Sequence, residues 1–202
     1  MKSMNQKVKE GYNRAANAYS NKFRDQFKSN RHLDMLIQKL EKGSTIVDIG
    51  CGSGAPIDAY LVRHGFAVTG IDISEEQIKL AKENVPEATY EVMDMSDLKK
   101  EQFQVDAVVS FYALFHIPRE QHLHVVQLMR SFLRPNGLLL ITMGASEWEG
   151  KDDDFCGTEM YWSHFGVEQN KELITTAGFS ILFDEIDTTG DEKHLIVLAR
   201  AV

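Results

Sequence analysis

The segment that decides the fold is TIVDIGCGSG, residues 45–54. Its first half is an apolar run typical of a buried strand, and its second half is a glycine-rich loop. Pro56 follows the loop and suits the first turn of a helix, where its missing N–H would have no partner. A strand, a glycine loop and a helix in this order are typical of a ligand-binding turn in an α/β sheet.

Apolar runs and helical patterns continue to alternate after this turn. Strands are predicted over residues 45–49, 68–73, 89–93, 106–111 and 138–143, and helices over 56–64, 74–84, 118–133 and 168–177. Ser74 is expected to cap the second of these helices in a capping box with Gln77, and a turn is expected at 135–137. This alternation predicts a parallel sheet with helices on both faces, which explains why its strands read as continuous apolar runs.

The end of the chain follows a different pattern. Two apolar runs, residues 180–186 and 194–199, are separated only by a polar turn that contains Gly190. No helix fits between them, so they are predicted to form an antiparallel hairpin.

The first 44 residues read as two amphipathic helices that precede the sheet. Tyr12, Ala15, Ala16 and Tyr19 share one face of the first helix. This segment is too small to fold alone, so we expect 1–44 to be a helical cap and 45–202 to be one α/β domain. Two roles stay open for the cap: it covers apolar surface of the sheet, or it forms a lid over a ligand site.

Composition limits the class of protein. The 202 residues are 43% apolar and carry a net charge of −8, which is typical of a globular domain and disfavours a general nucleic-acid binder. The two cysteines, Cys51 and Cys156, exclude a disulfide framework. No apolar run approaches the roughly 20 residues of a membrane span, and no signal-peptide pattern opens the chain. We therefore expect a cytoplasmic monomer or homodimer with no membrane partner.

The glycine loop and one carboxylate predict a cofactor site. Asp72 ends the second predicted strand, about 20 residues after Gly50, where a carboxylate can accept hydrogen bonds from both hydroxyls of a ribose. Gly50, Gly52 and Ala55 satisfy the dinucleotide pattern G-x-G-x-x-G/A, so NAD stays possible. Asp48 favours a cationic cofactor instead, because a pyrophosphate would gain nothing from a carboxylate there. The terminal hairpin also disfavours a dinucleotide domain, which continues in parallel units.

Five motifs in order resemble those of a known family. They are VDIGCGSG at 47–54, GIDIS at 70–74, DMSDL at 94–98, DAVVSFYALFHIP at 106–118 and LRPNGLLLI at 133–141. Together they resemble the class I S-adenosylmethionine-dependent methyltransferases, most closely the small single-domain bacterial type with a helical N-terminal cap. The resemblance implies a Rossmann-like, mostly parallel seven-stranded sheet of order 3-2-1-4-5-7-6 with strand 7 antiparallel, which agrees with the hairpin predicted above.

The resemblance also implies the cofactor-binding residues. Asp48 and the 50–54 loop would hold the methionine part, Asp72 the ribose, and the Asp94 region the adenine. The full predicted set is Tyr19, Asp48, Gly50, Cys51, Gly52, Gly54, Asp72, Ile73, Asp94, Met95 and Phe111. Alternatives remain: core packing for Met95 and Phe111, a helix cap for Asp72, and a small residue in a tight turn for Cys51.

Methyl transfer from a sulfonium mainly needs an aligned acceptor and a dry site. His116 is predicted to act as general base or acceptor ligand, with a backbone-bonded structural histidine as the alternative, and His164 is a second catalytic candidate. The aromatic cluster 160–165 is predicted to form a pocket wall for an apolar or aromatic acceptor, or else a packed loop. The predicted substrate-pocket residues are Tyr12, Tyr112, Tyr161 and Trp162.

The predicted function is methyl transfer from S-adenosylmethionine to a small molecule, with S-adenosylhomocysteine as product. Two alternatives stay open: an NAD(P)- or other nucleotide-binding Rossmann enzyme, and a non-catalytic S-adenosylmethionine-binding protein. No metal is expected, because no His, Cys or carboxylate cluster has ligand spacing. Residues 152–154, three consecutive aspartates, are expected to form a solvated loop.

Overall fold

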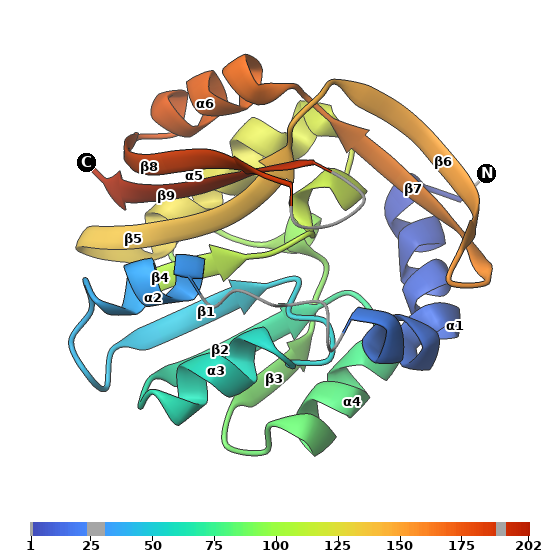
Figure 1. Ribbon diagram of the computed structural model, residues 1–202, viewed down its shortest axis with the longest axis horizontal. Helices are drawn as coiled ribbons and strands as arrows, with labels where there is room; N and C mark the ends of the chain where they lie inside the picture. Colours follow the sequence, from blue (N-terminus) through green and yellow to red (C-terminus); the bar gives the residue numbers. More distant parts are fainter. Residues whose placement is uncertain (1, 24–30, 189–192) are drawn as a thin grey trace.

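The computed structural model describes residues 2–23, 31–188 and 193–202. At its centre is a seven-stranded sheet of order β3-β2-β1-β4-β5-β9-β8 (Figure 1). Its strands are β1 Thr45–Ile49, β2 Ala67–Asp72, β3 Thr89–Val92, β4 Val105–Ser110, β5 Leu133–Gly144, β8 Phe179–Asp187 and β9 His194–Ala201. Strands β1 to β5 pair in parallel, and β9 is antiparallel to both β5 and β8. The predicted fold class, strand order and terminal hairpin are confirmed; the polar turn at Gly190 lies outside the described residues.

Helices cover both faces of the sheet, as the alternating pattern predicted. They are α1 Met4–Phe23, α2 Arg31–Ile37, α3 Ile57–Arg63, α4 Glu75–Asn84, α5 His122–Phe132 and α6 Val167–Thr176, with 3-10 turns η1 Met95–Asp97, η2 Leu114–His116 and η3 Arg119–Gln121. Helices α5 and α6 pack on one face of the sheet, while α2, α3 and α4 pack on the other. Ser74 caps α4 as predicted, accepting the backbone N–H of Gln77 at 3.1 Å. The predicted capping box is incomplete, because the backbone N–H of Ser74 donates to Asp72 and not to the side chain of Gln77.

A second, two-stranded sheet forms where a loop was expected. Strands β6 Trp148–Phe155 and β7 Thr158–His164 make an antiparallel hairpin, so the aspartates 152–154 are exposed but lie in a strand. Cys156 and Gly157 join the strands with φ values of 53° and 82°, the left-handed conformation that two-residue hairpins require. The prediction of a loop was therefore wrong.

Strand β5 also starts earlier than predicted. Residues 135–137 were expected to form a turn, but they belong to β5. The ladder with β4 is irregular here, jumping from Leu133 opposite Val105 to Leu138 opposite Ala107, and Asn136 has a φ of 66°. The turn residues therefore make a bulge within the strand instead of a separate turn.

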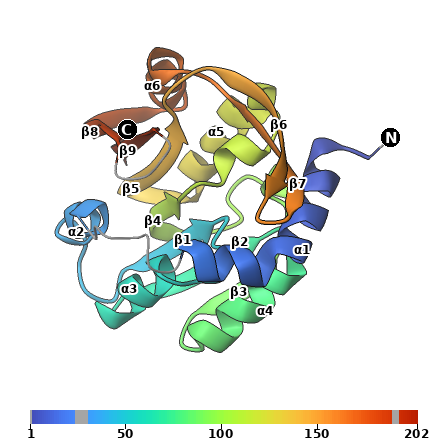
Figure 2. The same ribbon diagram turned by 45° about the vertical axis from the view of Figure 1, so that its right-hand side comes forward.

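The two N-terminal helices have different positions. Helix α1 crosses the carboxyl ends of the strands and lies beside the β6–β7 hairpin (Figure 2). Helix α2 instead packs on the sheet, where Leu33 and Leu36 are fully buried. Of the predicted cap, α1 is the helix that reaches the end of the sheet where α/β proteins bind their ligands.

Candidate active site

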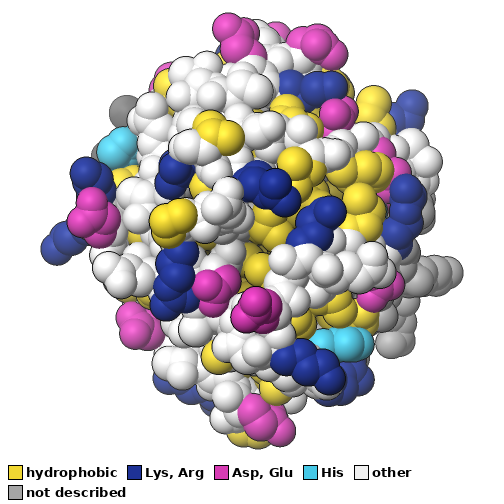
Figure 3. All heavy atoms as spheres, turned by 90° about the vertical axis from the view of Figure 1, so that its left-hand side faces the viewer, with side chains coloured by type: hydrophobic (Ala, Val, Ile, Leu, Met, Phe, Trp, Pro, Cys, Tyr) yellow, Lys and Arg dark blue, Asp and Glu magenta, His cyan; other side chains and the backbone are white. Residues whose placement is uncertain are grey.

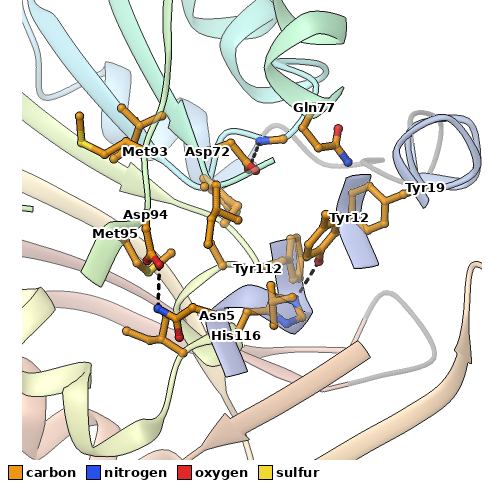
Figure 4. Close-up of a pocket in the computed structure, with 18 residues that line it drawn as sticks. Asn5, Tyr12, Tyr19, Asp72, Gln77, Met93, Asp94, Met95, Tyr112 and His116 are labelled. Carbon is orange, nitrogen blue, oxygen red and sulfur yellow. Dashed lines mark hydrogen bonds between the residues drawn. The ribbon is translucent and has the colours of Figure 1, made fainter. Parts of the chain in front are cut away.

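A pocket lies between α1 and the carboxyl ends of β1, β2 and β4 (Figure 4). Eleven of the residues predicted for the site line it: Tyr12, Tyr19, Gly50, Gly52, Asp72, Ile73, Asp94, Met95, Phe111, Tyr112 and His116. The sequence reasoning missed Asn5, Val8, Ile71, Gln77, Met93, Ala113 and Ile117, which complete the lining. The pocket therefore joins the predicted cofactor site and part of the predicted acceptor site in one space.

The glycine loop closes tightly against the strands. Gly50 has a φ of 82°, and a Cβ added to it would lie 2.2 Å from the Cβ of Ala113. No larger residue fits this position, because both the backbone conformation and the close contact require glycine. The backbone N–H of Gly52 donates to Asp72 Oδ2 at 2.9 Å, which ties the loop to the end of β2.

Asp72 fits both roles considered for it. Its Oδ1 accepts the backbone N–H of Ser74 at 2.9 Å, as a strand-end cap would. It also lines the pocket, and each carboxylate oxygen has a further lone pair for a ligand. Burial raises the pKa of Asp72 to about 6, although the backbone N–H groups of Ser74 and Gly52 oppose that rise. The carboxylate is thus mostly ionised at neutral pH.

Asp94 links the pocket to α1. Its Oδ1 accepts the backbone N–H of Ser96 at 2.9 Å, and its Oδ2 accepts Nδ2 of Asn5 at 2.8 Å. Asn5 Nδ2 also lies 2.8 Å from Ser96 Oγ. Figure 4 shows Asn5 and Asp94 meeting at the pocket. One side of the predicted adenine site is therefore built by α1, which no sequence motif indicated.

Gln77 is the most informative residue that the sequence reasoning left out of the site. Its side chain lines the pocket and is 1% exposed, and within the described structure neither amide atom has a hydrogen-bond partner. A buried polar group without a partner costs about 1–3 kcal/mol. The pocket therefore presents a donor and an acceptor that a bound polar ligand could satisfy.

His116 is held at both ring nitrogens. Nδ1 lies 2.7 Å from the carbonyl oxygen of Tyr161, and Nε2 lies 2.8 Å from the hydroxyl of Tyr12. A carbonyl only accepts, so Nδ1 carries the proton and Nε2 accepts the Tyr12 O–H. Burial lowers the pKa of His116 to about 4, so the imidazole is neutral at pH 7. The backbone contact predicted as the structural alternative is present, but it leaves Nε2 facing Tyr12 of α1 at the pocket.

Aromatic rings form the wall beside His116. The rings of Tyr12 and Tyr19 lie 5.3 Å apart, and Phe155 of the hairpin lies 6.3 Å and 5.8 Å from them. Tyr112 lines the pocket with a φ of 54°, a conformation that is uncommon for a bulky residue and tends to occur at functional sites. Phe155 directly follows the aspartates that were read as a loop, and it contacts the two tyrosine rings without lining the pocket itself.

Two predicted pocket residues lie one layer behind this wall. Trp162 packs 5.4 Å from the ring of His116, and the hydroxyl of Tyr161 lies 3.1 Å from Lys7 Nζ of α1. Neither residue lines the pocket. In this structure they support the wall from behind, and their contact with a substrate stays a prediction.

Four other predicted site residues do not line the pocket either. Asp48 is 2% exposed, and burial together with the nearby carboxyl of Asp58 raises its pKa. Cys51 packs with the α4 core, and burial raises its thiol pKa. His164 Nδ1 lies 2.6 Å from the carbonyl oxygen of Ser146. The fourth is Gly54, where a Cβ would lie 2.5 Å from the Tyr90 hydroxyl. These four residues therefore do not line the pocket, and their contact with a ligand stays a prediction.

The described ranges contain no group of three His, Cys, Asp or Glu side chains that could hold a metal ion. In the same ranges, no helix is both long enough and apolar enough to cross a membrane.

Comparison with known proteins adds a family to this geometry. Residues 46–137 match a family model described as a methyltransferase domain. This segment of the chain is a methyltransferase domain. The match confirms the resemblance seen in the sequence motifs. The first four motifs lie within the matched residues, and the fifth, at 133–141, overlaps their end.

Curated relatives of the methyltransferase domain share about half of the chain. A ubiquinone biosynthesis O-methyltransferase of Coxiella burnetii is 30% identical over 105 residues, which are 50% of this chain and 44% of that protein. A 2-methyl-6-phytyl-1,4-hydroquinone methyltransferase of Synechocystis is 32% identical over 120 residues, 58% of this chain and 36% of that protein. The chain thus matches less than half the length of either relative.

Solved structures share the fold of the whole chain. The magnesium protoporphyrin IX methyltransferase of Synechocystis, solved with bound S-adenosylmethionine, has a TM-score of 0.81 at 17% identity and covers 100% of this chain and 99% of its own. The [4+2]-cyclase SpnF has a TM-score of 0.76 at 18% identity, covering 98% and 96%. Because one neighbour is named as a cyclase, the fold alone does not decide which reaction the methyltransferase domain catalyses.

Proposed function

We propose that this chain transfers a methyl group from S-adenosylmethionine to a hydroxyl group of a small molecule with an apolar or aromatic body. The observation that carries this proposal is one shared pocket, which holds Asp72, Gln77 and Asp94 on one side and His116 among aromatic rings on the other. A cofactor and an acceptor bound in one pocket under one helix would be close enough to react.

The residues present fit the proposed cofactor. The Asp72 carboxylate would accept the ribose hydroxyls, and Asp94, Ile73 and Met95 would surround the adenine. The unpartnered amide of Gln77 would gain the hydrogen bonds it lacks. The glycine loop would pass close to the methionine part, because Gly50 and Gly52 present backbone without side chains.

The chain's own residues would supply alignment, dryness and one proton acceptor. When bound, S-adenosylmethionine would supply a methyl group that its positively charged sulfur makes electrophilic. Tyr12 and Tyr19 would cover the site from α1 and exclude water. His116 Nε2 would accept the proton that an acceptor hydroxyl loses, once that hydroxyl takes the place of the Tyr12 O–H.

The proposed class of acceptor is supported by the same side of the pocket. Its ring-lined wall suits an apolar or aromatic molecule. A neutral Nε2 that accepts hydrogen bonds suits a hydroxyl. Two relatives are named as an O-methyltransferase of ubiquinone biosynthesis and a hydroquinone methyltransferase, which supports the proposal of a ring-bearing hydroxyl compound.

We propose a cytoplasmic enzyme that acts as a monomer or homodimer, and charge and cysteine usage support the cytoplasmic location and a small-molecule acceptor. The net charge is −8, and both cysteines are free. On the end of the molecule away from α1, acidic and basic side chains are interspersed with apolar ones (Figure 3), without the single basic surface that nucleic-acid binding needs.

Thermal shift and methyl transfer test the proposal in two steps. S-adenosylmethionine and S-adenosylhomocysteine should raise the melting temperature, whereas NAD(H) should not; the reverse result would support the nucleotide-binding alternative. Labelled methyl should then appear on a member of a phenol and catechol panel. Binding without transfer to any hydroxyl, amine or thiol acceptor would support the non-catalytic alternative.

His116→Asn gives the residue-level test. Turnover should fall about 100-fold, because general base catalysis contributes about 10²-fold or more, while affinity for S-adenosylhomocysteine should change less than twofold. His124→Asn is the matched control, since His124 lies exposed on α5. Equal turnover of the two variants would contradict the proposed role of His116.

A further inference from the structure

The stretch of β7 that contacts α1 also holds the imidazole of His116. We propose that β7 is a positioning strand and Gly11 a positioning residue: the close approach of α1 at Gly11 seats both α1 and β7 so that His116 presents an unprotonated Nε2 to the acceptor. The inference rests on the proposed function, because it assigns the orientation of the proposed base.

Gly11 lies where α1 closely approaches β7. A Cβ added to Gly11 would lie 2.9 Å from Cε of Met160 and 3.0 Å from the carbonyl oxygen of Glu159. The backbone of Gly11 is ordinary helix, so its conformation does not require glycine. Glycine inside a helix is about 1 kcal/mol less favourable than alanine. The Met160 methyl group could turn aside, but the backbone carbonyl of Glu159 could not, so the close contact with that carbonyl is the physical reason for glycine at this position.

Two residues one helical turn before Gly11 also contact β7. Val8 is 3% exposed and packs with Met160 and Trp162. Lys7 Nζ lies 3.1 Å from the hydroxyl of Tyr161 and 4.5 Å from the centre of its ring. Tyr161 is also hydrogen-bonded to Glu159 of the same strand. One turn of α1 is thus fixed to the stretch of β7 that ends at Trp162.

The same stretch of β7 holds the imidazole. The carbonyl oxygen of Tyr161 accepts the proton on Nδ1 of His116 at 2.7 Å, and the ring of Trp162 lies 5.4 Å from the imidazole. From the other side Tyr12, the residue after Gly11, reaches Nε2 at 2.8 Å. Docking of α1 therefore brings together the partners of both ring nitrogens.

Loss of this docking would release both constraints. Without Tyr12 the Nε2 position opens to water, and without the contacts of Lys7 and Val8 the Tyr161 carbonyl is no longer held toward Nδ1. A neutral imidazole free of such partners exists in both tautomers. The tautomer with a proton on Nε2 cannot accept a proton from the acceptor at that atom, so turnover would fall.

Nitrogen-15 NMR of histidine-labelled protein tests the inference directly. The wild type should show one neutral tautomer for His116, with the proton on Nδ1. Gly11→Ala should show both tautomers, and its turnover should fall about 10-fold to 100-fold. Asn17→Ala is the matched control: it also replaces a weak helix former by alanine, but on the exposed face of α1, so tautomer and turnover should stay as in the wild type.

A second variant covers the case in which Gly11→Ala does not fold. Tyr161→Phe keeps the backbone carbonyl and removes only the hydroxyl that Lys7 contacts, so it should shift the His116 tautomers in the same direction to a smaller extent. A single Nδ1–H tautomer with full turnover in both variants would overturn the inference. The NMR measurement needs no cofactor. If the variants show altered tautomers but the wild type transfers no methyl group, the proposed function is refuted and the positioning role of Gly11 is not.

Discussion

The affinity for S-adenosylhomocysteine should depend on pH through Asp72. Its carboxylate lines the pocket, and its pKa is raised to about 6 because burial disfavours the charged form. With that pKa, the carboxylate is ionised in about 97% of molecules at pH 7.5 and in about 9% at pH 5. If ribose hydroxyls bind the ionised form, the dissociation constant should rise about 10-fold between pH 7.5 and pH 5.

The sign of the effect on stability is opposite. A carboxyl whose pKa is raised by folding binds its proton more tightly in the folded state, so its contribution is largest below about pH 4 and is lost as the pH rises through about 6. The ligand-free protein should therefore lose stability through Asp72 over the same range in which it gains affinity. Ligand binding below pH 6 should release a proton.

Isothermal titration calorimetry between pH 5 and pH 8, in buffers of different ionisation enthalpy, measures both the affinity and the proton release. Asp72→Asn should bind weakly, with a flat pH profile. Asp58→Asn is the matched control, because the pKa of Asp58 is raised to about 7 by burial but Asp58 does not line the pocket. A flat profile in the wild type, or a slope that disappears in Asp58→Asn and persists in Asp72→Asn, would refute the reasoning.

Two further outcomes are expected. Gln77→Met should weaken S-adenosylhomocysteine binding about 10-fold, since one hydrogen bond is worth about 1–1.5 kcal/mol. It should leave the ligand-free melting temperature equal or higher, because it removes two buried atoms that have no hydrogen-bond partner. A lower melting temperature with unchanged binding would contradict this. Phe132→Ala should lower the free energy of unfolding, measured by urea denaturation, by about 3–5 kcal/mol, because Phe132 is 1% exposed between α5 and the sheet. A loss below 1 kcal/mol would show that the core there is not packed as described.

Local sequence signals predicted the parts of the site that depend on neighbouring residues in the chain. The glycine loop and Asp72 follow buried strands, so their position at the carboxyl edge of the sheet follows from the strand pattern alone. His116 was placed near the pocket for the same reason, since it follows β4. Asp48 follows this logic too, but its side chain points into the core beside Asp58 instead of lining the pocket.

The features that the sequence did not predict share a physical cause. Asn5 meets Asp94 across 89 residues of sequence, and Gln77 shows no motif beyond the helix cap because its exceptional feature is the absence of a partner. The β6–β7 hairpin was read as a loop because its aspartates and its Cys156–Gly157 turn resemble solvated chain. Residues 158–162 nevertheless alternate between buried and partly buried side chains in a pattern of period two.

The sequence by itself determined the class of this protein. Apolar runs of strand length, one glycine loop and a terminal hairpin predict a mostly parallel sheet that ends in an antiparallel pair, because parallel strands need crossovers and a hairpin does not. The order of the strands was implied by the resemblance of the five motifs. Only the tertiary structure decided how the pocket is closed and how its histidine is held. Those properties depend on contacts between α1, β7 and η2, segments far apart in the chain, and such contacts are set by packing distance at residues like Gly11, which no local pattern encodes.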